Sequence, residues 1–204
     1  MQMPLFEPEN TQSPPNLLTK DGSAQYFRGI YTPESCISLF NTLLETIDWQ
    51  PDQITMFGHL ITTKRKVAWI GDEGCSYTYS GQKKCPQAWT PQLLTIKAKL
   101  EELAGWKFNS CLLNLYHNGS EGMGWHSDNE KELNPIAPIA SLSFGGERRF
   151  SFKHCNDKTS ISLRLENGSA LIMHAPTQDF WKHSLLKTTL IVPPRINLTF
   201  RDIL

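Results

Sequence analysis

The clearest pattern in the chain is a strict alternation of polar and apolar residues over positions 195–201. Because neighbouring side chains of a β-strand point to opposite faces, this segment is predicted to be a strand with one apolar and one polar face. The polar face either lies in water, as on an edge strand, or lines a buried site where its arginines need anionic partners. The odd positions carry Arg195, Asn197, Thr199 and Arg201, and the even positions carry Ile196, Leu198 and Phe200.

Two segments nearer the N-terminus have apolar residues at helical spacing instead. Each begins at a Thr-Pro pair, at Thr32 and at Thr90, which supplies an N-cap and a favoured first helical residue. The first helix is expected to end near 49–51 and the second at Gly105. The stripes expected to face the core are Ile37, Phe40, Leu44 and Ile47 in the first helix, and Leu93, Ile96, Leu100 and Leu103 in the second.

The rest of the chain favours short strands. Between the helices, runs of aromatic residues and glycines indicate hairpins and loops. From Trp106 onward, alternating runs are separated by turn signals at 118–119, 145–146 and 167–168. Such spacing is typical of an antiparallel sandwich or barrel, so the chain is predicted to be mainly β with flanking helices.

Length and composition indicate a single domain inside the cell. Residues 1–20 are rich in proline and polar residues and are predicted to form a flexible tail, which leaves 21–204 as one domain. No leader and no membrane-spanning run is expected, and the five cysteines lack paired spacing. Acidic and basic residues balance at 20 each, so local basic clusters would have to hold any nucleic acid.

A metal site is indicated by His126, Asp128 and His183. Residues two apart on a strand point the same way, so His126 and Asp128 are able to present an imidazole and a carboxylate to one ion. Taken alone, a His-x-Asp sequence also occurs by chance, and a lone histidine more often packs or caps. Three ligands on one side leave positions open on Fe(II) for a 2-oxo acid and dioxygen, whereas a structural zinc site takes a fourth protein ligand.

The polar strand strengthens this interpretation. Arg195 and Arg201 are separated by about 20 Å of backbone, and their long side chains, leaning toward each other, would hold a short dicarboxylate. Asn114 and Tyr116 share one face of another predicted strand and add hydrogen-bonding groups. The simplest account is a non-heme iron oxygenase that uses 2-oxoglutarate.

Several short motifs follow one another in a specific order. They are 114–116 (Asn-Leu-Tyr), 125–130 (Trp-His-Ser-Asp-Asn-Glu), 140–145 (Ala-Ser-Leu-Ser-Phe-Gly), His183 and 195–201. This ordered set resembles the AlkB family of Fe(II)/2-oxoglutarate-dependent dioxygenases over about residues 50–204. The resemblance implies a double-stranded β-helix, or jelly roll, over 106–204, with 21–105 supplying helices and a nucleotide-recognition lid.

The same resemblance implies a role for each site residue. His126, Asp128 and His183 would bind Fe(II) and carry catalysis. Arg195 would pair with the distal carboxylate of 2-oxoglutarate, while Arg201 would serve the carboxylate near the metal and steady Asp128. As a set, the cosubstrate residues would be Asn114, Tyr116, Arg195, Asn197, Thr199 and Arg201.

The reaction implied is oxidative demethylation of alkylated bases, of the 1-methyladenine and 3-methylcytosine type, with O2 as oxidant. The cosubstrate becomes succinate and CO2, and the N-methyl group leaves as formaldehyde. Because such a lesion lies on the pairing edge of the base, the enzyme must accept single strands or flip the base out of a duplex. The expected partner is therefore alkylated DNA, single- or double-stranded, with RNA as a further candidate.

Residues of the lid and of the loop after the metal ligands are expected to contact the nucleic acid. The resemblance implies an apolar finger that enters the gap left by a flipped base and a pocket for that base, and the positive charge of a methylated base favours acidic contacts to its edge. In the same order, these residues would be Met56, Phe57 and Gly58, then Tyr77, Tyr79 and Ser80, then Asn129 and Glu130. Candidate phosphate contacts are Lys64, Arg65, Lys66, Arg148 and Arg149.

Other interpretations stay open at this point. An AlkB-like oxygenase could act on RNA, protein or lipid, and a jelly roll with its ligands closed around zinc could bind nucleic acid without turnover. The paired arginines argue against the zinc alternative. A monomer without membrane contact is expected, in the cytoplasm or, in a eukaryote, in the nucleus.

Overall fold

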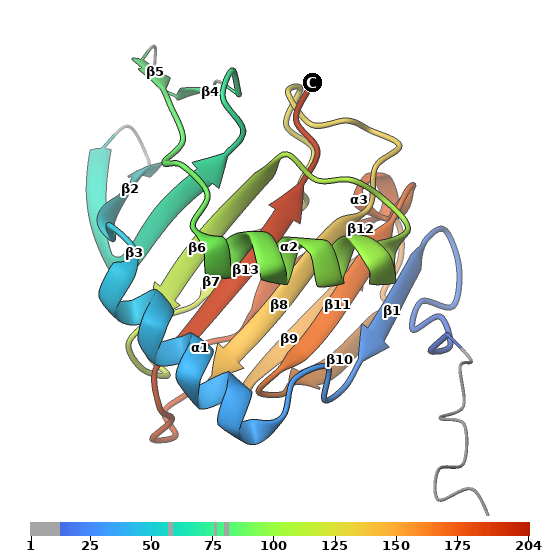
Figure 1. The fold of residues 1–204 in the computed structure, drawn as a ribbon. Helices are drawn as coiled ribbons and strands as arrows, with labels where there is room; N and C mark the ends of the chain where they lie inside the picture. Colours follow the sequence, from blue (N-terminus) through green and yellow to red (C-terminus); the bar gives the residue numbers. More distant parts are fainter. Residues whose placement is uncertain (1–12, 57–58, 76, 80–81) are drawn as a thin grey trace, which may run out of the picture.

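The computed structural model describes residues 13–56, 59–75, 77–79 and 82–204. Two β-sheets lie one behind the other, and two long helices cross the outer face of the larger sheet (Figure 1). The strand pairs of the described elements are antiparallel. This arrangement confirms the prediction of a mainly β jelly-roll core with flanking helices. No helix among the described residues is long and apolar enough to cross a membrane.

The sheets bring together strands that are distant in sequence. In spatial order, the larger sheet contains β1 (Ser23–Phe27), β11 (Ser169–His174), β8 (Ile139–Gly145), β13 (Arg195–Arg201), β6 (Ser110–Tyr116), β3 (His59–Gly71) and β2 (Gln50–Met56). The smaller sheet contains β10 (Ser160–Leu165), β9 (Arg148–His154), β12 (Trp181–Leu185) and β7 (Met123–His126), and a separate hairpin pairs β4 (Tyr77–Tyr79) with β5 (Gln82–Lys84). The central position of β13, between β8 and β6, decides where the site lies.

Both long helices begin at the predicted threonines. Helix α1 (Pro33–Thr46) is capped by Thr32, whose hydroxyl oxygen accepts a hydrogen bond from the Ser35 amide. Thr90 caps helix α2 (Pro91–Ala104) through the Leu93 amide in the same way. A short helix before β12, α3 (Thr177–Phe180), was not predicted, because four residues are too few to show a helical period.

The buried stripe of α1 differs from the predicted one. Ile37 and Leu44 are 61% and 41% exposed, whereas Cys36 and Leu43 are each 1% exposed. Apolar residues occupy adjacent positions at 36–37 and 43–44, so two stripes one residue apart fit the helical period equally well. Packing of α1 against the larger sheet selects the stripe that contains Cys36 and Leu43.

The packed part of the chain begins earlier than predicted. Leu18 is buried, and the Leu17 amide donates to the Ala24 carbonyl oxygen at 2.8 Å. The ring Nε1 of Trp181 donates to the Lys20 carbonyl oxygen at 3.0 Å. Residues 13–20 of the predicted tail therefore contact the core, and 1–12 lie outside the described residues.

The two faces of β13 belong to different layers. Its even-numbered residues are fully buried in the hydrophobic cluster that the larger sheet forms with α1 and α2. On the opposite face, Arg195, Asn197 and Thr199 are only 2%, 8% and 8% exposed and line a cavity together with residues of the smaller sheet. The polar row therefore lies inside the protein, and not on a solvent-facing edge.

Replacing Gly145 by alanine is expected to destabilise the protein. Gly145 ends β8 with φ of 86°, and an added Cβ would lie 2.3 Å from the Pro194 carbonyl oxygen. Backbone strain of about 1 to 2 kcal/mol and overpacking of about 1 to 3 kcal/mol should together lower the melting temperature by roughly 4 to 20 °C. Gly29→Ala is the matched control, because Gly29 also has positive φ but no atom within 4 Å of the added Cβ. Equal losses in the two variants would contradict the steric part of this prediction.

Candidate metal centre and cosubstrate pocket

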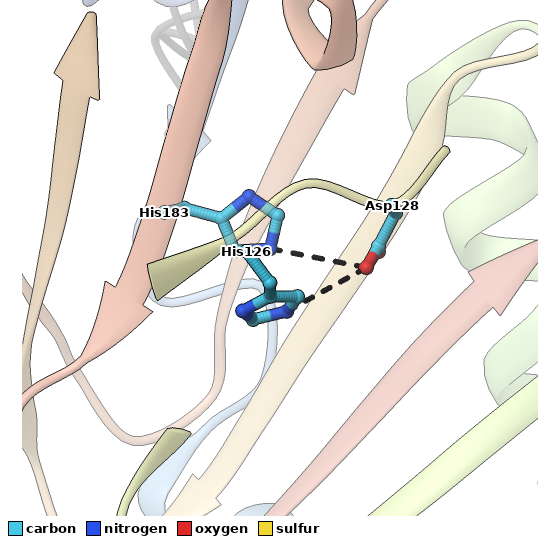
Figure 2. Close-up of side chains that lie close together, drawn as sticks. All are labelled: His126, Asp128 and His183. Atoms are coloured by element: carbon cyan, nitrogen blue, oxygen red, sulfur yellow. Dashed lines mark ion pairs between the residues drawn. The ribbon is translucent and has the colours of Figure 1, made fainter. Parts of the chain in front are cut away.

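The three predicted metal ligands lie together between the sheets (Figure 2). His126 ends β7 and pairs directly with His183 of β12, while Asp128 lies in the loop after β7. Asp128 Oδ1 is 3.6 Å from His126 Nε2 and 4.0 Å from His183 Nε2. The ligand atoms all lie within 4.8 Å of one another, and no other group of three His, Cys, Asp or Glu side chains in the described residues is placed to share an ion.

Hydrogen bonds orient the side chains of His126 and Asp128. His126 Nδ1 lies 2.8 Å from the Gly124 carbonyl oxygen, and donation there leaves the Nε2 lone pair free on the side of Asp128. Arg201 donates from Nη2 to Asp128 Oδ2 at 2.8 Å, which leaves Oδ1 directed toward the histidines. The Asp128 amide donates to Gln178 Oε1 at 3.0 Å. The atoms that would bind a metal therefore converge without competing partners.

Burial and charge keep His183 and Asp128 in the protonation states that a metal requires. Burial lowers the pKa of His183 to about 4, against the opposing effect of Asp128, so its imidazole is neutral at neutral pH. Burial also acts to raise the pKa of the Asp128 carboxyl, but Arg201 and the two histidines outweigh it and hold that pKa below its ordinary value. A neutral imidazole and an ionised carboxylate are the forms that bind metal.

A cavity of about 60 Å³ adjoins the ligands. The polar row of β13 and residues of β6 form one wall, and Met123, Phe150 and Leu185 of the smaller sheet contribute apolar surface. All of the predicted cosubstrate residues line this cavity: Asn114, Tyr116, Arg195, Asn197, Thr199 and Arg201.

Hydrogen bonds join the polar side chains of this wall into one row. Arg195 Nη2 donates to Asn197 Oδ1 at 2.6 Å and to Ser143 Oγ at 2.9 Å. Asn197 donates to Thr199 Oγ1 at 2.8 Å and accepts from Ser141 Oγ at 3.0 Å. Ser141 and Ser143 belong to the motif at 140–145, but no role was predicted for their hydroxyl groups, although they alternate with apolar residues of β8 in the same two-residue period that identified β13.

Buried polar atoms without partners show that the cavity fits a polar, anionic ligand. Arg195 forms no ion pair with any residue in the described ranges, and its pKa, lowered by burial to about 10, leaves it charged at neutral pH. The Nε atoms of Arg195 and Arg201, which are donors, also lack partners among the described residues. Because buried polar groups are nearly always paired, the residues fit a dicarboxylate beside a divalent metal.

The predicted nucleobase contacts are only partly described. Phe57, Gly58 and Ser80 lie outside the described residues. For Met56, Tyr77 and Tyr79 the structure gives the backbone, with Met56 at the end of β2 and both tyrosines in β4. The exposed Asn129 and Glu130 follow Asp128 and line a second cavity of about 360 Å³, which also reaches Asp128 and Arg201.

The predicted phosphate contacts divide into exposed and buried residues. Lys64, Lys66 and Arg149 are exposed. Arg65 and Arg148 are 8% and 2% exposed, so neither is placed to meet a phosphate group, and that part of the prediction is wrong. The reason is the strand period, which turns alternate members of a charged run to opposite faces.

Comparisons with known proteins agree with this site. Residues 23–201 match the model of the 2OG-Fe(II) oxygenase superfamily. The mouse (Mus musculus) protein named DNA oxidative demethylase ALKBH2 is 39% identical over 160 residues, which cover 74% of this chain and 67% of that protein. The human (Homo sapiens) protein of the same name is 39% identical, with 61% of its length covered. The cattle (Bos taurus) alpha-ketoglutarate-dependent dioxygenase alkB homolog 3 is 38% identical over 178 residues, which cover 81% of this chain and 61% of that protein.

Structural comparison supports the same fold. A solved structure described as "The structure of OsALKBH1" superposes with a TM-score of 0.58 at 18% identity, covering 92% of this chain and 100% of that one. The curated relatives are longer than the matched region, since the chain spans 61% to 67% of the mammalian proteins compared above. Family match, identity and fold agree, and the chain therefore belongs to the AlkB-type members of the 2OG-Fe(II) oxygenase superfamily, which use Fe(II), 2-oxoglutarate and O2.

Proposed function

We propose that the protein demethylates alkylated DNA bases by oxidation. The observation that carries this proposal is one buried cavity that contains both the His126, Asp128 and His183 cluster and Arg195, a cation without an anionic partner in the described part of the chain. The relatives named DNA oxidative demethylases support the choice of substrate.

In this proposal His126, Asp128 and His183 hold Fe(II) from one side. When bound, the iron supplies dioxygen activation, with 2-oxoglutarate as the reductant that leaves as succinate and CO2. Arg201 keeps Asp128 ionised and fixes its orientation through their 2.8 Å hydrogen bond. The apolar side chains around the ligands keep bulk water away from the reacting groups.

The polar wall would bind the cosubstrate. Arg195 pairs with the distal carboxylate, and Asn197 and Thr199 hold Arg195 in place through the hydrogen-bonded row. Asn114 and Tyr116 complete the hydrogen bonds of the cosubstrate from β6. Arg201, between Asp128 and the cavity, serves the carboxylate next to the metal.

The substrate would be a methylated base that carries positive charge, as 1-methyladenine and 3-methylcytosine do. Glu130, which is exposed and lines a cavity with Asp128, would contact such a base, with Asn129 next to it. The β2–β3 and β4–β5 hairpins would supply the lid, with Met56, Tyr77 and Tyr79 on their strands. Lys64 and Lys66 remain the exposed phosphate contacts of β3.

We also propose that the protein acts as a monomer inside the cell. The proposed ligands of the metal and of the cosubstrate all line one cavity of a single chain, so the proposed chemistry calls for no residue from a second copy. Size-exclusion chromatography at the assay concentration measures this directly, and activity confined to a dimer fraction would contradict it.

The proposal predicts formaldehyde release from methylated oligonucleotides. Oligonucleotides with one 1-methyladenine or 3-methylcytosine are incubated with protein, Fe(II), 2-oxoglutarate and O2, as single- and double-stranded DNA and as RNA. Methylated DNA should be turned over and unmethylated DNA should not, and omission of 2-oxoglutarate should stop the reaction. Turnover of RNA alone, or of a methylated peptide or lipid in place of any base, would overturn the DNA proposal.

An anaerobic titration separates the oxygenase from a zinc-bound module without turnover. Addition of Fe(II) and then 2-oxoglutarate should give the weak visible charge-transfer band of a chelated 2-oxo acid. Retention of zinc, with no band after metal exchange, would favour the binding module over the enzyme.

A further inference from the structure

We propose that Arg148, which lies outside the cavity, is a positioning residue for the distal end of the cosubstrate site. In this role Arg148 fixes the ring of Tyr116 and the loop after it, and adds a second buried positive charge behind Arg195. The inference rests on the proposed use of 2-oxoglutarate. The sequence had indicated a phosphate contact for Arg148, which its burial argues against.

Arg148 is almost completely enclosed. It is the first residue of β9, only 2% of its surface is exposed, and it does not line the cosubstrate cavity. Its guanidinium donates to four backbone carbonyl oxygens: those of Asn118 at 3.2 Å, Gly119 at 3.3 Å, Glu121 at 2.6 Å and Leu186 at 2.8 Å. These acceptors fix both the position and the plane of the guanidinium.

The four carbonyl groups belong to two connections that lead into the site. Three of them lie in the loop that follows Tyr116 at the end of β6 and leads to β7, which carries His126. The fourth, on Leu186, directly follows β12, which carries His183. Arg148 therefore ties together the ends of three strands that hold site residues.

Arg148 also shares an aromatic ring with the proposed carboxylate ligand. Its Cζ lies 6.0 Å from the ring centroid of Tyr116, and the Cζ of Arg195 lies 5.5 Å from the same centroid. Tyr116 is 4% exposed and lines the cavity. Cation–π attraction holds the ring against both guanidiniums, so movement of Arg148 would be felt at Arg195 through Tyr116.

Among the residues that the structure describes, no carboxylate forms an ion pair with Arg148. The Glu121 carboxylate favours the charged form of Arg148, but it accepts a hydrogen bond from the His117 amide at 2.9 Å and contacts the His117 ring at 3.1 Å. Arg148 itself donates only to the backbone oxygen of Glu121. A buried charge is costly to keep for packing alone, because an apolar side chain of similar volume fills space without that cost. Arg148 and Arg195 lie on one ring without a direct carboxylate partner among the described residues, and the Cζ of Arg65 also lies 5.9 Å from that ring's centroid. This concentration of positive charge favours a ligand with a carboxylate at that end.

The test compares Arg148→Met and Arg148→Lys with Arg149→Met, a matched control at the next residue. Arg149 is exposed and donates to Ser162 Oγ on the outer side of the smaller sheet. Anaerobic Fe(II)-loaded proteins are titrated with 2-oxoglutarate and with 2-oxobutyrate, a 2-oxo acid that lacks the distal carboxylate, and the visible band gives each Kd. Thermal unfolding of the same samples measures stability.

Arg148→Met should weaken 2-oxoglutarate binding about tenfold, which corresponds to about 1.4 kcal/mol, and leave the Kd for 2-oxobutyrate within about threefold of the wild type. Arg148→Lys should restore part of the loss, and Arg149→Met should bind like the wild type. Equal weakening of both ligands, or no weakening of either, would show that Arg148 has only a structural role. If Arg148→Met does not fold, the ratio of the two Kd values in Arg148→Lys decides the question. A wild-type protein that binds neither ligand would overturn the proposed function itself.

Discussion

Asp128→Asn is expected to reduce formaldehyde release to the level measured without protein. The substitution replaces the anionic metal ligand by a neutral amide, while Arg201 stays nearby and contributes uncompensated positive charge that repels a cation. The purified variant should therefore also retain less iron than the wild type after anaerobic loading and desalting. Iron content by a colorimetric chelator and formaldehyde release from methylated DNA measure the two effects separately.

The same variant should be less stable before any metal is added. The Arg201 and Asp128 side chains are only 16% and 4% exposed, so the guanidinium would lose its charged partner in a buried site. Breaking a buried ion pair lowers the free energy of unfolding by about 3 to 5 kcal/mol. The expected loss lies toward the lower end of this range, because the asparagine amide oxygen still accepts a hydrogen bond from Arg201. Asp48→Asn makes the same chemical change at an exposed position and should leave iron content and turnover unchanged. An active, iron-binding Asp128→Asn variant would remove the basis for the metal assignment.

The two-residue period made the central strand of the site predictable. The alternation of residues 195–201 predicted a two-faced strand, and the structure places its polar face between the sheets. The sequence alone left open whether that face met water, because the pattern of one strand does not show which strands pair with it or which sheet packs against it. The direct pairing of His126 with His183 across β7 and β12 likewise depends on sheet order, which local patterns do not encode.

Local patterns were ambiguous where two arrangements fitted the same pattern. In α1, adjacent apolar pairs allowed two stripes, and contact with the sheet buried Cys36 and Leu43 in place of Ile37 and Leu44. Charge misled the interpretation of Arg148, because a guanidinium is tolerated inside a protein when backbone carbonyl groups surround it. Such acceptors come from loops whose path only the folded chain defines.

Arg195→Met is expected to weaken 2-oxoglutarate binding roughly 100-fold, which corresponds to about 2.7 kcal/mol, because it removes the charged partner of the distal carboxylate. Binding is measured by anaerobic titration of the Fe(II)-loaded protein. At saturating 2-oxoglutarate, kcat should fall much less than kcat/KM, since the metal ligands are untouched. Arg195→Lys should recover only part of the affinity, because an ammonium group lacks the paired donors of guanidinium. Arg164→Met, at an exposed arginine of β10, is the control.

The loss of 2-oxoglutarate affinity in Arg195→Met is compared with that in Arg148→Met. The comparison tests whether Arg195 contacts the distal carboxylate directly while Arg148 acts through Tyr116. Arg195 lines the cavity, whereas Arg148 reaches it through Tyr116, so removal of Arg195 must weaken 2-oxoglutarate binding more than removal of Arg148. Both variants should bind 2-oxobutyrate nearly as the wild type does, because that ligand has no distal carboxylate to lose contact with. Unchanged 2-oxoglutarate affinity in Arg195→Met would show that the dicarboxylate is held elsewhere, and the buried, unpaired charge of Arg195 would then require a different anion.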